Sequence, residues 1–116
     1  MTHDDWLIAK LEAVEVAAEA VRAALDDVAA LLAPARAARV AGVPLPVIAQ
    51  SLVETAAEPR RRTVEQFVLF EQSVGALRAS VVRALVDDEG ASFSGLAKAM
   101  GISRQAVTRL YRAGRS

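Results

Sequence analysis

The last helical stretch of the chain groups side chains that can donate several hydrogen bonds at once. Arg104, Gln105, Thr108, Arg109 and Arg112 recur at spacings that place them on one face of an α-helix. A guanidinium group offers a rigid fork of donors, and amide and hydroxyl groups add single hydrogen bonds. We expect this face to bind the base edges and phosphates of double-stranded DNA.

The residues around this face indicate how it is positioned. Gly101 stands where a sharp turn needs a residue that tolerates positive φ, and Ser103 can cap the helix that follows. A short helix before the turn would hold a small residue, Ala97, where the two helices touch. The inward faces of both helices are apolar and are supplied by Leu96, Met100, Ile102, Val107 and Leu110.

This stretch, FSGLAKAMGISRQAVTRLYR over residues 93–112, resembles the helix-turn-helix of bacterial repressors and of the C-terminal domains of serine recombinases. The resemblance implies a tri-helical unit from about Ala76, with Ser103–Arg112 as the recognition helix. Most such proteins are transcriptional regulators that bind paired half-sites as dimers. The alternative is an ordinary helical hairpin with a solvated basic face. The residues expected to contact DNA are Lys98, Ser103, Arg104, Gln105, Thr108, Arg109, Arg112 and Arg115.

The distribution of charge favours DNA binding at this end of the chain. The formal net charge is zero, with 14 basic and 14 acidic residues. Residues 93–116 nevertheless carry Lys98 and four arginines without any acidic residue, whereas residues 1–33 are strongly acidic. The basic end supplies the electrostatic attraction that phosphate contact requires, and the acidic start should point away from DNA.

A long N-terminal helix is expected over Asp4–Ala33, since no glycine or proline occurs before Pro34. Its apolar residues alternate in steps of four and three, which is a heptad pattern over about four heptads. The pattern fits a homodimer interface, in which parallel pairing would place Lys10 near Glu15 of the partner subunit. It fits equally well a helix that packs within its own chain. The seam consists of Leu7, Leu11, Val14, Ala18, Val21, Leu25, Val28 and Leu32.

A second long helix is expected from Arg62 or Thr63 to Asp87, with Gly90 as its terminating glycine. The region between the long helices contains Gly42, Pro44, Pro46 and Pro59. Part of it aligns with the C-terminal motif at a spacing of 48 residues, which suggests a degenerate helix-turn-helix-like unit or a chance match of alanine-rich helices. The sequence thus predicts an all-α chain with an assembly helix (1–33), a middle helical region (34–75) and a DNA-binding unit (76–116).

Composition argues against several functions. The chain has no cysteine and a single histidine, His3, so it offers no disulfide framework, thiolate chemistry, zinc site or histidine-dependent triad. It also lacks a glycine-rich phosphate loop. We therefore expect no enzyme activity, no metal and no cofactor. No apolar run approaches a membrane span and no signal peptide precedes the acidic start, so a cytoplasmic, nucleoid-associated protein is expected.

These patterns lead to one functional hypothesis and two alternatives. The hypothesis is a dimeric transcriptional regulator that binds specific double-stranded DNA. The first alternative is a protein-interaction module whose partner is a sigma factor or a nucleoid protein. The second is a nucleoid or replication-associated protein that binds DNA with little sequence preference. Salt-sensitive binding to random duplex DNA separates the interaction module from the two DNA-binding proteins.

Overall fold

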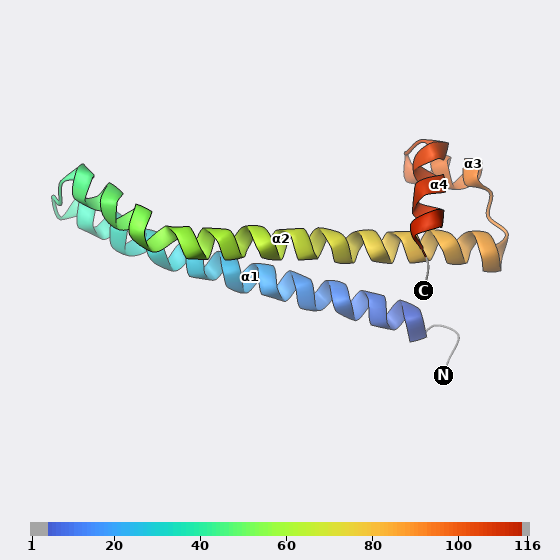
Figure 1. Cartoon of the computed structure of the whole chain (residues 1–116), viewed down its shortest axis with the longest axis horizontal. Helices are drawn as coiled ribbons and strands as arrows, with labels where there is room; N and C mark the ends of the chain where they lie inside the picture. Colours follow the sequence, from blue (N-terminus) through green and yellow to red (C-terminus); the bar gives the residue numbers. More distant parts are fainter. Residues whose placement is uncertain (1–4, 115–116) are drawn as a thin grey trace. The chain divides into compact units, whose positions relative to one another are not determined.

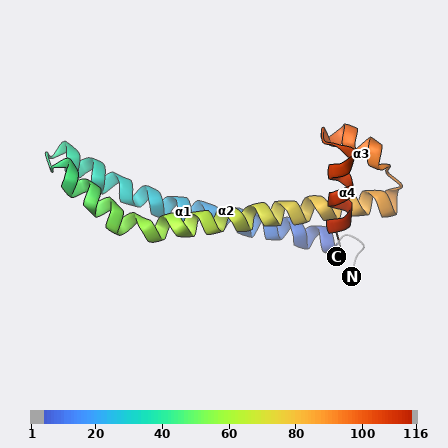
Figure 2. The same cartoon turned by 45° about the horizontal axis from the view of Figure 1, so that its top comes forward.

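The computed structural model describes residues 5–114 of the 116-residue chain. These residues form four α-helices and no β-strand (Figure 1, and turned by 45° in Figure 2). The helices are α1 (Asp5–Val40), α2 (Leu45–Glu89), α3 (Phe93–Met100) and α4 (Arg104–Ala113). The all-α prediction is confirmed for this part of the chain. No described helix combines the length and the apolar character needed to cross a membrane.

The predicted end of the first helix is wrong. Helix α1 continues through Pro34 and ends at Val40 instead of stopping at Ala33. Proline removes one helical hydrogen bond, but its fixed φ is compatible with a helix, and the surrounding alanines have the highest helix propensity. Gly42, two residues beyond the last helical residue, has φ +90° and turns the chain away from the helix. The amide of Val43 then donates to the carbonyl of Ala38 at 3.0 Å, which is the hydrogen bond of a Schellman cap.

The prediction of separate middle helices is also wrong. The region expected between the two long helices does not hold a helix of its own, because residues 45–62 belong to one continuous helix, α2, which runs through Pro59 to Glu89. The turn that a degenerate helix-turn-helix-like unit would need in this region is therefore not formed. Pro46 lies in the first turn, where a missing amide proton costs little. The hydroxyl of Thr63 donates to the carbonyl of Pro59 at 2.9 Å and binds the helix one turn beyond the proline.

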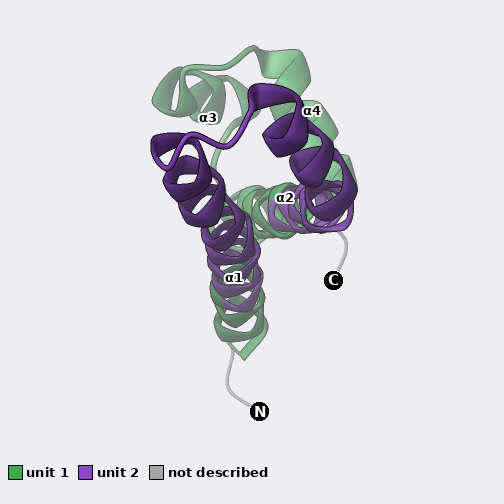
Figure 3. Cartoon of the chain, turned by 90° about the vertical axis from the view of Figure 1, so that its left-hand side faces the viewer, with its two compact units in different colours: residues 1–15, 71–116 green, residues 16–70 purple. Residues whose placement is uncertain are grey.

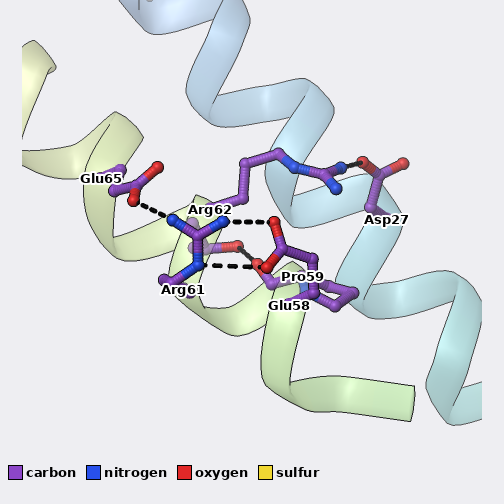
Figure 4. A network of polar contacts seen from close by, with 7 residues as sticks. Asp27, Glu58, Pro59, Arg61, Arg62 and Glu65 are labelled. Atoms are coloured by element: carbon purple, nitrogen blue, oxygen red, sulfur yellow. Dashed lines mark hydrogen bonds and ion pairs between the residues drawn. The ribbon is translucent and has the colours of Figure 1, made fainter.

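The chain divides into two compact units, coloured separately in Figure 3. The unit of residues 16–70 is an antiparallel pair made by the second part of α1 and the first part of α2. Its buried apolar side chains are Ala24 and Ile48, at 3% and 9% exposure. Ion pairs lie along its surface: Arg62 binds Asp27 at 3.0 Å, and Arg61 binds both Glu58 and Glu65 (Figure 4). All are exposed, so they add little stability.

The other unit combines residues 1–15 with residues 71–116, of which 5–15 and 71–114 are described. Its core is formed by Val82, Leu96 and Val107, which are 1%, 9% and 0% exposed. One of these side chains comes from each of α2, α3 and α4. This cluster fixes α3 and α4 on the C-terminal part of α2 and thereby sets which face of α4 is exposed.

Candidate nucleic-acid interface

Two serine caps and a glycine define the ends of α3 and α4. The side chain of Ser92 accepts a hydrogen bond from the amide of Gly95 and begins α3. Gly101 ends that helix with φ +68°, in the left-handed region. Ser103 then caps α4 by accepting from the amide of Ala106 at 3.0 Å. The roles predicted for Gly101 and Ser103 are confirmed.

The inward face of α4 is the predicted one. Val107 is completely buried, and Leu110 packs half-buried against the same cluster. From α3 and the turn, Leu96 is buried and Met100 and Ile102 are half-buried in contact with it. The five residues predicted to form the apolar seam therefore meet in one cluster. Since this cluster occupies one side of α4, the polar residues are left on the other side.

The residues predicted to contact DNA lie on that second side or beside it. Arg104, Gln105, Arg109 and Arg112 are exposed on α4, and Lys98 is exposed in the last turn of α3. Two hydroxyl groups are already engaged: Thr108 donates to the carbonyl of Arg104 at 3.1 Å, and Ser103 serves as the cap. Arg115 lies outside the described residues.

The charges on this side of the molecule are not neutralised within the described chain. Residues 93–114 contain no acidic side chain, and Lys98, Arg104, Arg109 and Arg112 form no ion pair with any described residue. Arginines elsewhere in the chain do form ion pairs: Arg61, for example, binds two glutamates. The guanidinium groups of α4 therefore retain their donors for an external acceptor.

A polar contact that sequence reasoning missed holds α4 on α2. The hydroxyl of Tyr111 donates to Oδ1 of Asp87 at 2.7 Å, and Nε of Arg83 donates to Oδ2 of the same carboxylate at 2.9 Å. Arg83 also donates through Nη1 to the carbonyl oxygen of Tyr111 at 3.3 Å, and its guanidinium carbon lies 4.3 Å from the ring centroid. Phe93 packs against that ring at 5.3 Å between centroids. The only advance signal was the spacing of Arg83 and Asp87, four residues apart on one helix.

The same contact shifts two pKa values in opposite directions. The hydrogen bond from Tyr111 lowers the pKa of Asp87, and the hydrogen bond from Arg83 and its charge lower it further against an opposing effect of burial. The pKa of Tyr111 is raised, chiefly because its proton is held by Asp87. Both shifts favour the state in which the carboxylate is charged and the phenol is protonated.

Gly114 provides a second contact that the sequence did not reveal. Its backbone follows α4 closely, since its amide donates to the carbonyl of Tyr111 at 3.3 Å. The residue is buried, and a Cβ atom there would lie 2.2 Å from the carbonyl oxygen of Ala79 on α2. Only glycine allows the end of α4 to approach α2 so closely.

The predicted seam of α1 is partly covered and partly exposed. Leu11, Leu25 and Leu32 are 44%, 45% and 57% exposed. The remaining seam residues are half-buried: Leu7, Val14, Ala18, Val21 and Val28. Packing within the chain thus covers part of the heptad seam and leaves Leu11, Leu25 and Leu32 accessible.

No group of three or more histidine, cysteine, aspartate or glutamate side chains gathers among the described residues in a way that would hold a metal ion. Comparison with known proteins adds no relative: no family model, no curated protein and no solved structure matches the chain. Function is therefore inferred from the geometry of α4 itself.

Proposed function

We propose that the protein binds double-stranded DNA through the exposed face of α4, with α3 and α4 acting as a helix-turn-helix. The observation that carries this proposal is the two-sided character of α4. Its buried side docks through Val107, and its opposite side presents Arg104, Gln105, Arg109 and Arg112 without an internal ion pair. A short helix that is docked through one side and carries multidentate donors on its free face suits the major groove.

The positions of the polar side chains along α4 favour base contacts at one end and phosphate contacts at the other. Arg104 and Gln105 stand at its N-terminal end, which is the end that enters the groove in helix-turn-helix proteins. Arginine binds guanine and glutamine binds adenine through paired hydrogen bonds, so these two side chains would read base edges. Arg112, in the last turn of α4, and Lys98 on α3 would meet phosphates.

In this proposal the protein acts as a dimeric transcriptional regulator. One ten-residue helix contacts only a few base pairs, and a two-fold axis doubles the contact. Exposed apolar side chains on α1 and α2 favour such an assembly, among them Leu25, Leu32 and Phe67. Binding to chromosomal DNA would place the protein at the nucleoid.

A salt titration tests the proposal. The full chain is titrated against labelled random-sequence duplex, and binding is followed by fluorescence anisotropy over a range of salt concentrations. Affinity should fall steeply with salt, because phosphate contacts release bound cations. Arg112→Ala should weaken binding to every sequence and lower the slope of log K against log salt by about one.

A matched control variant separates the loss of a specific phosphate contact from a general effect of lower positive charge on DNA binding. Arg36 is exposed on α1 and forms no ion pair with a described residue, so Arg36→Ala removes the same charge from the unit of residues 16–70, which does not contain α4. It should leave both affinity and slope unchanged. Absence of binding at low salt would overturn the proposal and favour a protein-interaction module.

A further inference from the structure

One face of α2 carries a short pattern that is complementary to itself. Arg60, Val64, Phe67 and Glu71 follow one another in steps of four, three and four along the uninterrupted helix. These steps keep all four side chains on one stripe. All four are exposed, with Val64 at 57% and Phe67 at 45%.

The two charges at the ends of this stripe have no partner within the described chain. Arg60 and Glu71 form no hydrogen bond or ion pair with a described residue, although the neighbouring arginines do. Figure 4 shows Arg61 bound to Glu58 and Glu65, and Arg62 bound to Asp27. The surface charges around Pro59 are thus largely neutralised, and Arg60 is an exception among them.

The stripe is symmetric about the point midway between Val64 and Phe67. Two copies of α2 crossing antiparallel at that point would place Arg60 opposite Glu71 of the second copy, and Val64 opposite its Phe67. The same alignment places Ala57 opposite Val74 of the second copy, in the alternating layers of an antiparallel coiled coil. Parallel, in-register pairing would instead set Arg60 against Arg60 and Glu71 against Glu71, which is repulsive.

We propose that a second copy of this chain docks on this stripe in antiparallel orientation, with two Arg60–Glu71 ion pairs flanking a cluster of two valines and two phenylalanines. This inference deepens the assembly part of the proposed function. It supplies what the unit of residues 16–70 lacks, because that unit buries only Ala24 and Ile48 among its described apolar side chains. Burial of Val64 and Phe67 from both copies would remove further apolar surface from water.

Charge reversal tests the contact. The dimer dissociation constant of the full chain is measured by sedimentation without DNA for the wild type, Arg60→Glu, Glu71→Arg and the double variant. Each single variant creates two like-charge contacts and should weaken the dimer about tenfold or more. The double variant exchanges the charges and should restore the dimer to near the wild-type constant.

Controls separate the interface from the fold. Arg61→Glu reverses a charge on the neighbouring residue, which lies off the stripe, and should leave the dimer unchanged. Circular dichroism and thermal unfolding should show that all variants keep their helices. Since the chain has no cysteine, Ala57→Cys reports the orientation of the two copies. Antiparallel pairing separates the two thiols by roughly 25 Å and prevents a disulfide, whereas parallel pairing allows one.

Three outcomes would overturn the inference. A mass of one chain at tens of micromolar would show that the stripe does not bind a second copy and is open to another protein. A dimer dissociation constant that does not change with the charge at residues 60 and 71 would show that the dimer interface lies on another surface. Efficient crosslinking of Ala57→Cys would contradict the antiparallel orientation. None of these outcomes bears on the salt-dependent binding of DNA, so failure here is distinguishable from failure of the DNA-binding proposal.

Discussion

Tyr111 and Asp87 are joined by a hydrogen bond of 2.7 Å that links α4 to the C-terminal part of α2. Arg83 donates to the carboxylate of Asp87 and to the backbone carbonyl oxygen of Tyr111, so it links the same two residues a second time. The buried side of α4 is held by apolar contact with the cluster of Val82, Leu96 and Val107. The hydrogen bonds to Asp87 and Arg83 are directional and add to this contact where α4 meets α2.

Tyr111→Phe removes the hydroxyl and keeps the ring against Phe93 and Arg83. We expect a lower free energy of unfolding and a change in its pH dependence. Asp87 has a lowered pKa, so its stabilisation is present above the ordinary pKa of aspartate and is lost as pH falls through the lowered value. Tyr111 has a raised pKa, so its stabilisation is complete below the ordinary pKa of tyrosine and is lost as pH rises through the raised value.

Urea unfolding of the wild type and Tyr111→Phe at a series of pH values measures this effect. The difference between the two proteins should be largest on a plateau between the two pKa values and should shrink at both extremes. A difference that stays constant across acidic and alkaline pH would mean that the hydroxyl contributes by packing alone.

Val107→Ala should destabilise the protein by about 2 kcal/mol, because two buried methyl groups are lost and a small cavity remains. Val107 is 0% exposed at the centre of the cluster that docks α4. Val68→Ala makes the same chemical change at a residue that is 50% exposed and should cost less than about 0.5 kcal/mol. Chemical denaturation followed by circular dichroism gives both values. Equal losses for the two variants would contradict the assigned core.

Gly114→Ala should lower stability by roughly 1–3 kcal/mol, because the new Cβ would clash with the carbonyl oxygen of Ala79 and displace the end of α4. Gly75→Ala is the matched control, since a Cβ at that position of α2 meets nothing within 4 Å. The control should raise stability by up to about 1 kcal/mol, through better helix propensity. Thermal unfolding measures both changes, and a Gly114→Ala variant as stable as the wild type would show that the approach of Gly114 to Ala79 is not tight.

Arg104→Ala or Gln105→Ala should weaken binding to the preferred DNA site by roughly 1–3 kcal/mol and binding to random duplex much less. The preferred site is first obtained by selection from a random duplex library. Binding of each variant to selected and random duplex is then compared at one salt concentration. If affinity for both duplexes fell equally, these side chains would contact phosphates and the base-reading role would be wrong.

Local features of α3 and α4 were predictable because short-range chemistry determines them. Gly101 tolerates the left-handed conformation, and Ser103 caps the helix behind it. The inward position of Val107 follows from helical periodicity. Each of these rules operates over at most a few residues, so the neighbouring sequence is enough to apply it.

The long helices were harder to predict because prolines that disfavour a helix stand among residues and contacts that favour it. Pro34 and Pro59 favour helix ends by local chemistry, yet α1 and α2 pass through both. Around Pro59 the helix is held by Thr63, which donates to the carbonyls of Pro59 and Ala24, and by the ion pair from Arg62 to Asp27. The pairing of Tyr111 with Asp87 across 24 residues was likewise invisible, because it depends on the docking angle of α4.

The free face of α4 carries charge of one sign only. Between residues 93 and 114 the chain has lysine, arginine and one tyrosine, but no aspartate, glutamate or histidine. A phosphate that approached this face would therefore be attracted by every charged side chain on it and repelled by none. A partner with positive charge would be repelled by the same residues, so the face selects for anionic surfaces.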